Sequence, residues 1–531
     1  MSDKRLKFFG WGYEGDQIAA DELQWFENSW GRVLGVDKFS VKPAPQLTEI
    51  ELRRPRVAPP ARLAQICSTE KYDRAAHTYG KSVIDLARML DRDFSNPPDV
   101  VAYPHTEEEI VALLDWAGGN NIAVTPYGGG SSVVGGIEPT TDERYRGALT
   151  IDLRHLGKVI EIDRMSEAAR VQAGVYGPAL ERQLKPSGLA MRFFLQAFEF
   201  SSLGGWIATR AAGHYATGST QIDDHIESVR AITPSGILEY RRLPASGAGP
   251  DPNRLFLGSE GTLGIVTEAW VKLRKQPRFR ASTTVRIADF YKGAEMVRAV
   301  SQAGLYPSNC RLIEAEEAAF TEAGDGSNAI VILGFESADH PVDTWMRRAL
   351  QICADHGGKW DEGETRDAAA NWRDKFIRGP YLREHAVARC VMRDTFESSI
   401  TWDRFAQFHT NVKRDALTAI KEITGRAGSV TCRFTHVYPD GPAPYFTYHA
   451  LGDGVRLVQQ FRDLKAACAA ALVRHGGTVT HHHAVGRDHM AGYRIEQPPL
   501  FAAVLSAAKR VLDPSGILNP GILMPPQPTV I

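Results

Sequence analysis

The chain has 531 residues, which is too long for one ordinary core and predicts two or three domains. Its 62 lysines and arginines nearly balance its 63 aspartates and glutamates, so bulk charge does not indicate a nucleic-acid partner. Six cysteines lie without CxxC pairs, and no apolar run approaches the length that spans a bilayer. We therefore expect a soluble, cytoplasmic protein, with peripheral membrane contact left open.

Residues 1–96 are expected to form a helical segment that packs against the rest of the chain. They mix aromatic, charged and proline-rich stretches, notably Gly10-Trp11-Gly12-Tyr13 and RRPRVAPPAR at 53–62. No convergent set of polar residues is recognisable there. A structural role is the simpler interpretation of this segment.

From residue 97 the pattern changes to short apolar strands, helices and glycine turns, which is typical of α/β or α+β architecture. A helix is predicted to open at Thr106 with Glu109 in capping-box position, followed by the strand NNIAVTP. The turn TPYGGGSSVVGG at 125–136 comes next. Its glycines would let backbone N–H groups face an anion such as a pyrophosphate, although a plain surface turn has the same composition.

Two more glycine turns follow, AFEFSSLGGWIATRAAG at 197–213 and LGSEGTLGIVTEAWVKL at 257–273. The second runs into a strongly β-prone strand. Since all three turns adjoin strands, they predict one extended ligand that is touched at several places. A cofactor of dinucleotide size suits this description.

In this order, PYGGGSSVVGG, FEFSSLGGWIATR and GSEGTLGIVTEA resemble the PCMH-type FAD-binding domain of the vanillyl-alcohol oxidase superfamily. The resemblance implies FAD, with its diphosphate at the first turn, its flavin and ribityl parts at the second, and backbone contacts at the third. No GxGxxG follows the first strand, which disfavours a nicotinamide cofactor. The implied cofactor residues are Pro126, Tyr127, Gly128, Gly129, Gly130, Ser131, Ser132, Gln196, Ala197, Phe198, Glu199, Phe200, Ser201, Ser202, Thr209, Arg210, Ala211, Ala212, Glu260, Gly261, Thr262, Leu263, Gly264, Ile265 and Val266.

From about 278 to 470, strands and helices alternate again, which indicates a second domain lying over the flavin as a substrate cap. The last segment carries a histidine motif and helices, and its ending, VLDPSGILNPGILMPP, resembles the C-terminal signature of flavin-linked 2-hydroxyacid dehydrogenases. The predicted fold class is α+β. The predicted divisions are a helical segment, an FAD-binding domain, a cap and a C-terminal segment, at 1–96, 97–277, 278–470 and 471–531.

The sequence TVTHHHAVG places His481, His482 and His483 in a row. If this stretch is a strand, His481 and His483 share one face and His482 points to the other, so the three could not bind one metal by themselves. Adjacent imidazoles oppose one another's protonation, which would keep at least one neutral and able to accept a proton. A histidine-rich surface turn is the alternative.

Superfamily members that oxidise 2-hydroxyacids carry SGEHGIG at this place, with the glutamate as a metal ligand. Here THHHAVG puts His482 at that position. Their partner motif HxGDGNxH is replaced by THVYPDGPAPYFTYHA. The comparison implies that this chain holds no metal.

The same segments, together with the GWGY motif, are similar to the alkylglycerone-phosphate synthase (alkyldihydroxyacetonephosphate synthase) family. In that family, N5 of FAD acts as an electrophile, forms an adduct with acyl-dihydroxyacetone phosphate, and lets a long-chain alcohol replace the fatty acid. The resemblance implies ether lipid synthesis, a lipid-phosphate substrate, non-covalent FAD and a homodimer.

The family's acid–base tyrosine corresponds to Tyr445 in PYFTYHA. The resemblance implies that Tyr445 and the three histidines handle protons. A phenol is a weak base at neutral pH, so it would need a neighbouring cation or histidine. A packing role for Tyr445 is equally open.

Arg383 stands at the family's position for a substrate-binding arginine, and Arg311 is a weaker candidate for the same task. A guanidinium offers a planar, permanently charged fork that suits a phosphate or carboxylate. A surface salt bridge with Glu384 or Glu397 is the plain alternative for Arg383. For Arg311, as for Arg433, a charge at a strand edge is the simpler interpretation.

Three departures from the synthase pattern bear on the substrate. Ala245 stands where the family has an arginine, the chain ends in LNPGIL, and the segment GHYATGSTQIDD after the second turn differs. A second hypothesis is therefore a metal-independent FAD oxidase or dehydrogenase of an alcohol or 2-hydroxyacid, with His483 or Tyr445 as base. A third is a non-catalytic protein that keeps the flavin fold as a scaffold.

Overall fold

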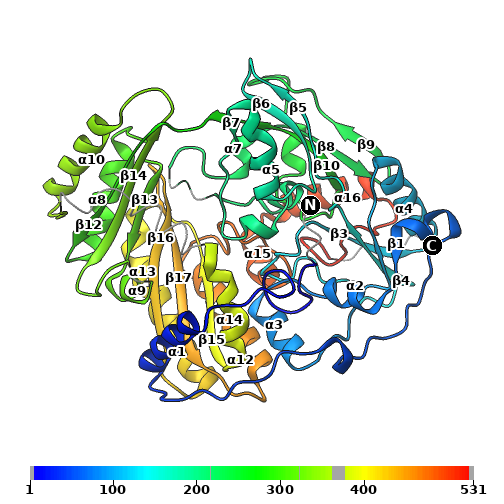
Figure 1. Ribbon diagram of the computed structural model, residues 1–531, viewed down its shortest axis with the longest axis horizontal. Coiled ribbons are helices and arrows are strands. Elements are labelled where there is room, and N and C mark those ends of the chain that lie inside the picture. The colour runs from blue at the N-terminus through cyan, green and yellow to red at the C-terminus, as the bar shows by residue number, and fades with distance from the viewer. Residues whose placement is uncertain (1–4, 214, 216, 322, 362–376, 526–531) are drawn as a thin grey trace.

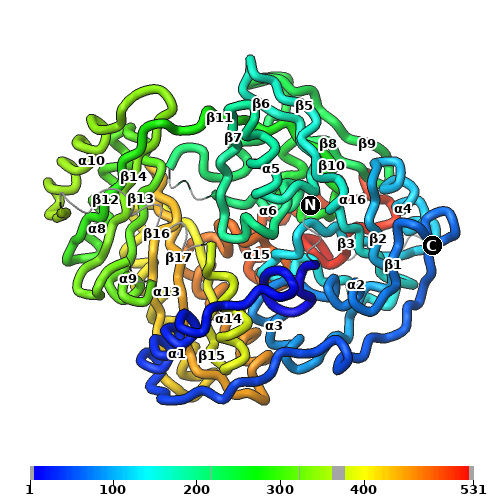
Figure 2. Tube along the Cα trace, in the orientation of Figure 1, coloured from blue at the N-terminus to red at the C-terminus, as the bar shows by residue number. Residues whose placement is uncertain are grey.

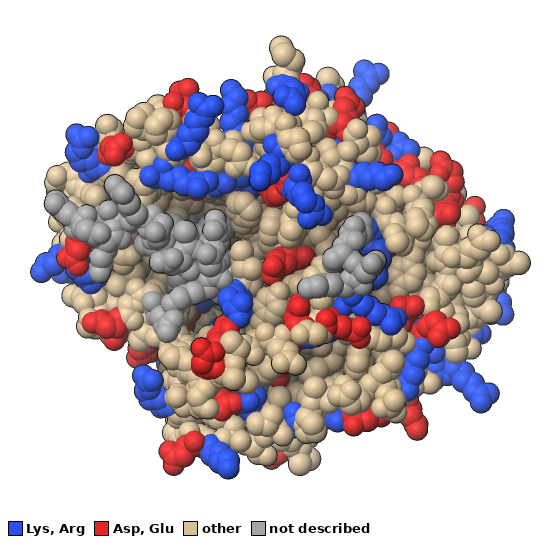
Figure 3. Space-filling model, viewed as in Figure 1, with Lys and Arg blue, Asp and Glu red and all other residues tan. Residues whose placement is uncertain are grey.

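A computed structural model describes residues 5–213, 215, 217–321, 323–361 and 377–525. The strands form two groups, a first within residues 67–275 and a second within residues 279–451, which lie on opposite sides of Figure 1. The N-terminal segment runs along both groups (Figure 2). Basic and acidic side chains are interspersed on the face shown in Figure 3, as expected from a net charge of −1. Among the described residues no helix is long and apolar enough to cross a membrane.

A four-stranded sheet carries the first glycine turn. Its order is β1-β2-β4-β3, and β3 and β2 run parallel to β4. The expected helix before β3 is confirmed as α4 (Glu107–Gly119), because Thr106 Oγ1 accepts a hydrogen bond from Glu109 N at 3.3 Å. The strands are β1 (Cys67–Ser68), β2 (Val100–Ala102), β3 (Ile122–Tyr127) and β4 (Gly147–Asp152).

A five-stranded antiparallel sheet, of order β5-β6-β10-β8-β9, carries the third glycine turn just before β10. The second turn leads into the short helix α6, which Ser202 caps by accepting a hydrogen bond from Gly205 N. The elements of this part are β5 (Val159–Asp163), β6 (Ala168–Gln172), α5 (Gly177–Leu184), β7 (Leu189–Ala190), α6 (Leu203–Thr209), α7 (Ile222–His225), β8 (Ile226–Thr233), β9 (Gly236–Glu239), β10 (Ile265–Lys272) and β11 (Arg274–Lys275).

The second group of strands is a six-stranded sheet of order β12-β14-β13-β16-β17-β15. Its pairs are all antiparallel, and its core joins the sheet to α8, α10, α13 and α14. The elements are β12 (Phe279–Ile287), α8 (Phe290–Gln302), β13 (Asn309–Ile313), α9 (Ala315–Phe320), β14 (Ala329–Ser337), α10 (Asp343–Asp355), α12 (Arg383–Ala388), β15 (Val391–Glu397), α13 (Trp402–Thr424), β16 (Ser429–Val437), β17 (Pro442–Leu451) and α14 (Leu457–Arg474).

The terminal segments join these two groups. The N-terminal one holds α1 (Ala20–Leu34), α2 (Lys71–Ala76) and α3 (Val83–Leu90), and between α1 and α2 the chain is largely extended. Helix α3 packs into the core of the six-stranded sheet. At the other end, α15 (Met490–Glu496) and α16 (Pro499–Leu512) precede Ile517 and Leu518, which belong to the core beneath β3. The hydrophobic cores therefore cross the divisions expected from the sequence.

Candidate functional site

One cavity lies where the two groups of strands meet, and its wall draws on all three glycine turns. The sheet of the second group contributes Arg311, Thr435, His436 and Tyr445, and the C-terminal segment contributes His482 and His483. Of the residues expected at the cofactor, the wall contains Pro126, Tyr127, Gly128, Gly129, Gly130, Ser131, Ser132, Gln196, Ala197, Ser201, Ser202, Thr209, Ala211, Ala212, Glu260, Gly261, Gly264, Ile265 and Val266.

Glycine is required where these turns meet. A Cβ atom on Gly129 would lie 1.7 Å from the carbonyl oxygen of Phe200, in the second turn. Gly261, in the third turn, has φ +73°, and a Cβ there would lie 2.8 Å from Cγ of Pro126. Because Gly129 meets the backbone of the second turn and Gly261 meets the ring of Pro126, only residues without side chains at these two positions let the turns close around a shared space.

The remaining expected cofactor residues lie outside the cavity wall. Arg210 forms an ion pair with Asp223, and Glu199 accepts a hydrogen bond from Tyr381 Oη at 2.9 Å. The other four side chains are turned into the protein. Thr262 Oγ1 donates to a backbone carbonyl, and Phe198, Phe200 and Leu263 are buried apolar side chains.

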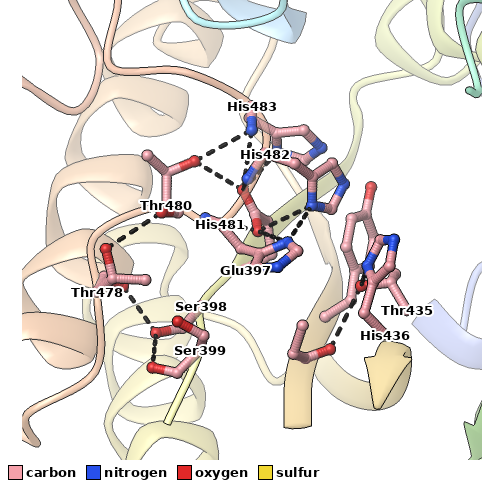
Figure 4. Close-up of polar contacts among 12 residues, drawn as sticks. Glu397, Ser398, Ser399, Thr435, His436, Thr478, Thr480, His481, His482 and His483 are labelled. Carbon is pink, nitrogen blue, oxygen red and sulfur yellow. Dashed lines mark hydrogen bonds and ion pairs between the residues drawn. The ribbon is translucent and has the colours of Figure 1, made fainter. Parts of the chain in front are cut away.

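The histidine triplet forms a loop, so the expectation of a strand is wrong. The backbone N–H groups of His481, His482 and His483 all donate to the carboxylate of Glu397, at 2.8, 3.0 and 3.1 Å (Figure 4). Thr480 Oγ1 donates to the same carboxylate at 2.7 Å. Successive N–H groups of a strand point in opposite directions, so three in a row cannot reach one acceptor from a strand.

Glu397 stands at the end of β15 and is 2% exposed. Burial alone would raise its pKa, but the neighbouring His482 and His483 outweigh burial and hold the pKa of Glu397 well below its usual value. Glu397 is therefore a buried carboxylate that fixes the histidine loop. From the sequence, Glu397 is expected only as an ion-pair partner of Arg383.

The three imidazoles have different surroundings. His482 Nδ1 lies 3.2 Å from Glu397 Oε2 and 2.9 Å from Nδ1 of His481, whose Nε2 lies 2.9 Å from Tyr438 Oη. Burial lowers the pKa of His481 to about 4 and that of His483 well below its usual value. These two rings are neutral at neutral pH. His482 and His483 line the cavity, whereas His481 lies behind them.

His436, His481 and His482 have ring nitrogens within 4.8 Å of one another, close enough to be considered for a metal ion. Their nitrogens already have other partners, however. His436 Nε2 lies 3.0 Å from the carbonyl oxygen of Gly213, and its Nδ1 lies 3.1 Å from Thr435 Oγ1. Because a metal would have to displace these hydrogen bonds, we do not assign the three histidines as metal ligands.

Tyr445 combines packing with a place in the cavity wall. Its ring is 3% exposed and stacks on His482 at a centroid distance of 5.9 Å, with His483 edge-on at 5.5 Å. The hydroxyl donates to Thr395 Oγ1 at 3.0 Å. The guanidinium carbon of Arg433 lies 4.2 Å from the centroid of the Tyr445 ring. Arg433 also forms a buried ion pair with Glu317, so the expectation that it is a charge at a strand edge is wrong.

Both expected substrate arginines line the cavity. Arg311 is 1% exposed, and burial together with the charge of Arg433 lowers its pKa to about 9, so it too is not a charge at a strand edge. Arg383 begins α12, and its Nη1 donates to the carbonyl oxygen of Lys81 at 3.4 Å. The expected alternative, an ion pair of Arg383 with Glu384 or Glu397, is not formed within the described residues.

The N-terminal segment, for which a structural role is expected, reaches the cavity through the GWGY motif. The backbone N–H of Trp11 donates to Glu384 Oε2 at 2.9 Å, and a Cβ on Gly10 would lie 2.5 Å from Glu384 Oε1. The Trp11 ring is 4% exposed, packs edge-on against Phe200 at 5.5 Å and lines the cavity. In the sequence, only the family resemblance of the GWGY motif pointed to this place.

The C-terminal segment supports the first and third turns. Asn519 lines the cavity, and its Nδ2 donates to the carbonyl oxygens of Gly136 and Glu260. The Glu260 carboxylate accepts hydrogen bonds from Val485 N and Gly486 N, and burial raises the pKa of Glu260 to about 7. Ala245, another departure from the synthase pattern, is exposed and lies outside the cavity wall.

Comparison with known proteins gives two matching family models. One is described as an FAD binding domain and matches residues 98–240, and the other, described as the C-terminal domain of FAD linked oxidases, matches residues 276–523. Residues 1–97, including the GWGY motif, lie outside both matches.

Similar proteins of the curated set include alkyldihydroxyacetonephosphate synthases. That of Dictyostelium discoideum is 29% identical over 86% of this chain and 78% of its own length. That of Trypanosoma brucei brucei is 28% identical over 99% of this chain and 93% of its own length. A solved structure of an alkyldihydroxyacetonephosphate synthase superposes with a TM-score of 0.82 at 25% identity, over 97% of this chain and 98% of that one.

Proposed function

Because the chain is an FAD-linked flavoenzyme homologous to the alkyldihydroxyacetonephosphate synthases, we propose that it exchanges the acyl group of an acyl-dihydroxyacetone phosphate for a long-chain alkyl group, a step of ether lipid synthesis. One observation carries the proposal. A single cavity wall joins three glycine turns to the phenol of Tyr445, three histidines and two arginines. These groups suit a phosphorylated substrate that must lose and regain protons beside a cofactor.

The first turn fits the diphosphate of FAD. Gly128, Gly129 and Gly130 present backbone without side chains to the cavity, and Gly205 and Gly261 border the same space. Such backbone can approach a ligand closely. Bound FAD would supply an electrophilic nitrogen, N5, for the exchange.

We propose that the protein holds FAD without a covalent bond. Acid precipitation of the protein should then leave the yellow colour in solution, and colour in the pellet would contradict this proposal.

Arg311 and Arg383 would bind the substrate phosphate. Both guanidinium groups line the cavity, and each offers a planar, permanently charged fork that suits a phosphate. Arg383→Lys keeps the charge but loses the planar fork, so we expect KM for the phosphorylated substrate to rise about tenfold or more. Arg426→Lys, at an exposed position, is the control and should leave KM unchanged.

Tyr445, His482 and His483 would move protons on the bound substrate. The stacking of His482 on Tyr445 places an imidazole and a phenol at one end of the cavity. His483 is neutral at neutral pH, since burial lowers its pKa, and can accept a proton. His481 would act only through His482.

A metal-independent oxidase or dehydrogenase of an alcohol or 2-hydroxyacid is the second candidate. The match of residues 276–523 to the C-terminal domain of FAD linked oxidases favours it. In that reaction FAD would accept hydride, and His483 or Tyr445 would take the hydroxyl proton. Peripheral membrane contact, a homodimer and a cytoplasmic location stay predictions.

One anaerobic experiment separates the candidates. Turnover of acyl-dihydroxyacetone phosphate with a fatty alcohol, without loss of the oxidised flavin spectrum, supports the exchange reaction. Bleaching of the flavin by an alcohol or a 2-hydroxyacid supports the oxidase instead. A protein that takes up no FAD would contradict both reactions and leave the scaffold hypothesis.

A further inference from the structure

A continuous series of hydrogen bonds leads from His482 away from the cavity. His482 Nδ1 lies 2.9 Å from His481 Nδ1, and His481 Nε2 lies 2.9 Å from the hydroxyl of Tyr438. That hydroxyl lies 3.1 Å from Thr220 Oγ1. The four side chains come from two distant loops and the residue after β16. None of the functions described above uses Tyr438 or Thr220.

Glu397 gives this series a direction. An ionised carboxylate can only accept, so in the singly protonated form of His482 the proton lies on Nδ1, facing Glu397. His481 must then accept at Nδ1 and carry its own proton on Nε2, from which it donates to Tyr438. Tyr438 in turn can donate to Thr220. This assignment leaves Nε2 of His482 without a proton and therefore able to take one.

The far end of the series approaches the surface. Tyr438 is half-buried. Thr220 is itself buried, and its backbone N–H, not its hydroxyl, donates to the carboxylate of Asp224, which is exposed. His481 is neutral at neutral pH, because burial lowers its pKa, and so can receive a proton at Nδ1. His436 stacks on Tyr438 at 6.1 Å and helps to hold its ring.

We propose that His481 and Tyr438 form a proton relay that carries the proton accepted by His482 out of the cavity, with Glu397 fixing the tautomer of His482. Tyr438 thus acts through His482, as a positioning residue. This inference rests on the proposed function only in that His482 takes a proton from the substrate. The oxidase reaction would need the same transfer.

The relay conserves protons and moves no electrons. One proton enters at Nε2 of His482, and the proton on Nδ1 passes to Nδ1 of His481. The Nε2 proton of His481 passes to the oxygen of Tyr438, which releases its own proton toward Thr220 and solvent. Running in reverse, the series returns a proton to the substrate.

Tyr438→Phe tests the relay, since it removes one hydroxyl and keeps the ring. We expect kcat to fall about 10- to 100-fold with FAD content and melting temperature unchanged, and added imidazole to restore activity as its concentration rises. Tyr448→Phe is the matched control, because the buried Tyr448 hydroxyl has no hydrogen-bond partner within the described residues. It should keep wild-type kcat and show no effect of imidazole.

Wild-type kcat in Tyr438→Phe would overturn the relay, as would a loss of activity that no small proton carrier restores. Thr220→Val removes the next link and should give a weaker loss with the same rescue. NMR of the protein labelled with ¹⁵N-histidine gives a readout independent of turnover, in which His481 should carry its proton on Nε2. A wild type inactive toward acyl-dihydroxyacetone phosphate would contradict the proposed function alone, and the relay would then be tested with a substrate that bleaches the flavin.

Discussion

The carboxylate of Glu397 lies 3.2 Å from Nδ1 of His482 and also accepts hydrogen bonds from the backbone of the whole histidine triplet. One buried acid thus fixes both the path of the loop and the orientation of a ring that lines the cavity. Carboxylate–imidazole pairs of this kind hold the ring in one tautomer and stabilise its protonated form. The chemistry of the triplet therefore depends on β15, which ends at Glu397.

Replacing Glu397 by Gln should lower kcat strongly while FAD stays bound. The amide keeps an oxygen for the loop, but it removes the negative charge beside His482, and we expect a loss of about 100-fold. Steady-state kinetics with the flavin spectrum as a check of cofactor content measures this. Glu336→Gln, in β14 and in an ion pair with Arg192, is the control for loss of a carboxylate. Equal losses in both variants would contradict a specific role for Glu397.

The same variant should change how stability depends on pH. The pKa of Glu397 in the folded protein lies well below 4.5, so its stabilising contribution is complete above about pH 4.5 and is lost as the pH falls further. The wild type should exceed Glu397→Gln in unfolding free energy at pH 7. Below pH 4.5 that gap should shrink by about 1.4 kcal/mol for each pH unit. Denaturant titrations at several pH values measure the gap, and a constant gap would refute this assignment.

Replacing Tyr445 by Phe should abolish turnover and leave the protein yellow. The variant removes the hydroxyl that donates to Thr395 but keeps the ring between Arg433 and His482. Loss of a general acid–base group costs about 100- to 10,000-fold in rate. Rapid-quench product analysis measures the rate, and the visible absorbance spectrum shows whether the flavin is still bound. Retained activity would show that Tyr445 serves packing alone.

Trp11→Ala should raise KM more than it lowers kcat, because the indole lines the cavity but carries no group that moves a proton. Melting temperature should fall, since truncating a buried tryptophan costs about 3–5 kcal/mol. Trp345→Ala, in α10 on the far side of the six-stranded sheet, serves as the control and should leave KM unchanged (Figure 1). If Trp11→Ala also keeps the wild-type KM, the N-terminal segment has only a structural role.

Chelators should not affect the wild type. The nitrogens of His436 and His481 already form hydrogen bonds within the protein, and the family resemblance implies no metal. Activity after prolonged treatment with EDTA, together with elemental analysis of the purified protein, tests this. One zinc per chain, with activity that depends on it, would overturn our interpretation of the histidines.

The glycine turns and the elements around them could be predicted from the sequence because their signals are local. A capping threonine, an apolar strand and glycines in a row each report on a few neighbouring residues, and α4, β3 and the first turn follow in that order. The histidine loop could not be predicted this way. Its conformation is set by Glu397, which lies 84 to 86 positions earlier in the chain.

The sequence by itself thus determined the α+β class, the three side-chain-free turns and the residue types available for acid–base chemistry. Only the tertiary structure decided which of them face one cavity. It pairs Trp11 with Glu384 across 373 positions, and it turns Phe200 and Arg210 away from the space that Gly129 and Tyr445 border. The reason is physical: hydrogen bonds to a buried carboxylate and the packing of rings join residues with no sequence pattern in common.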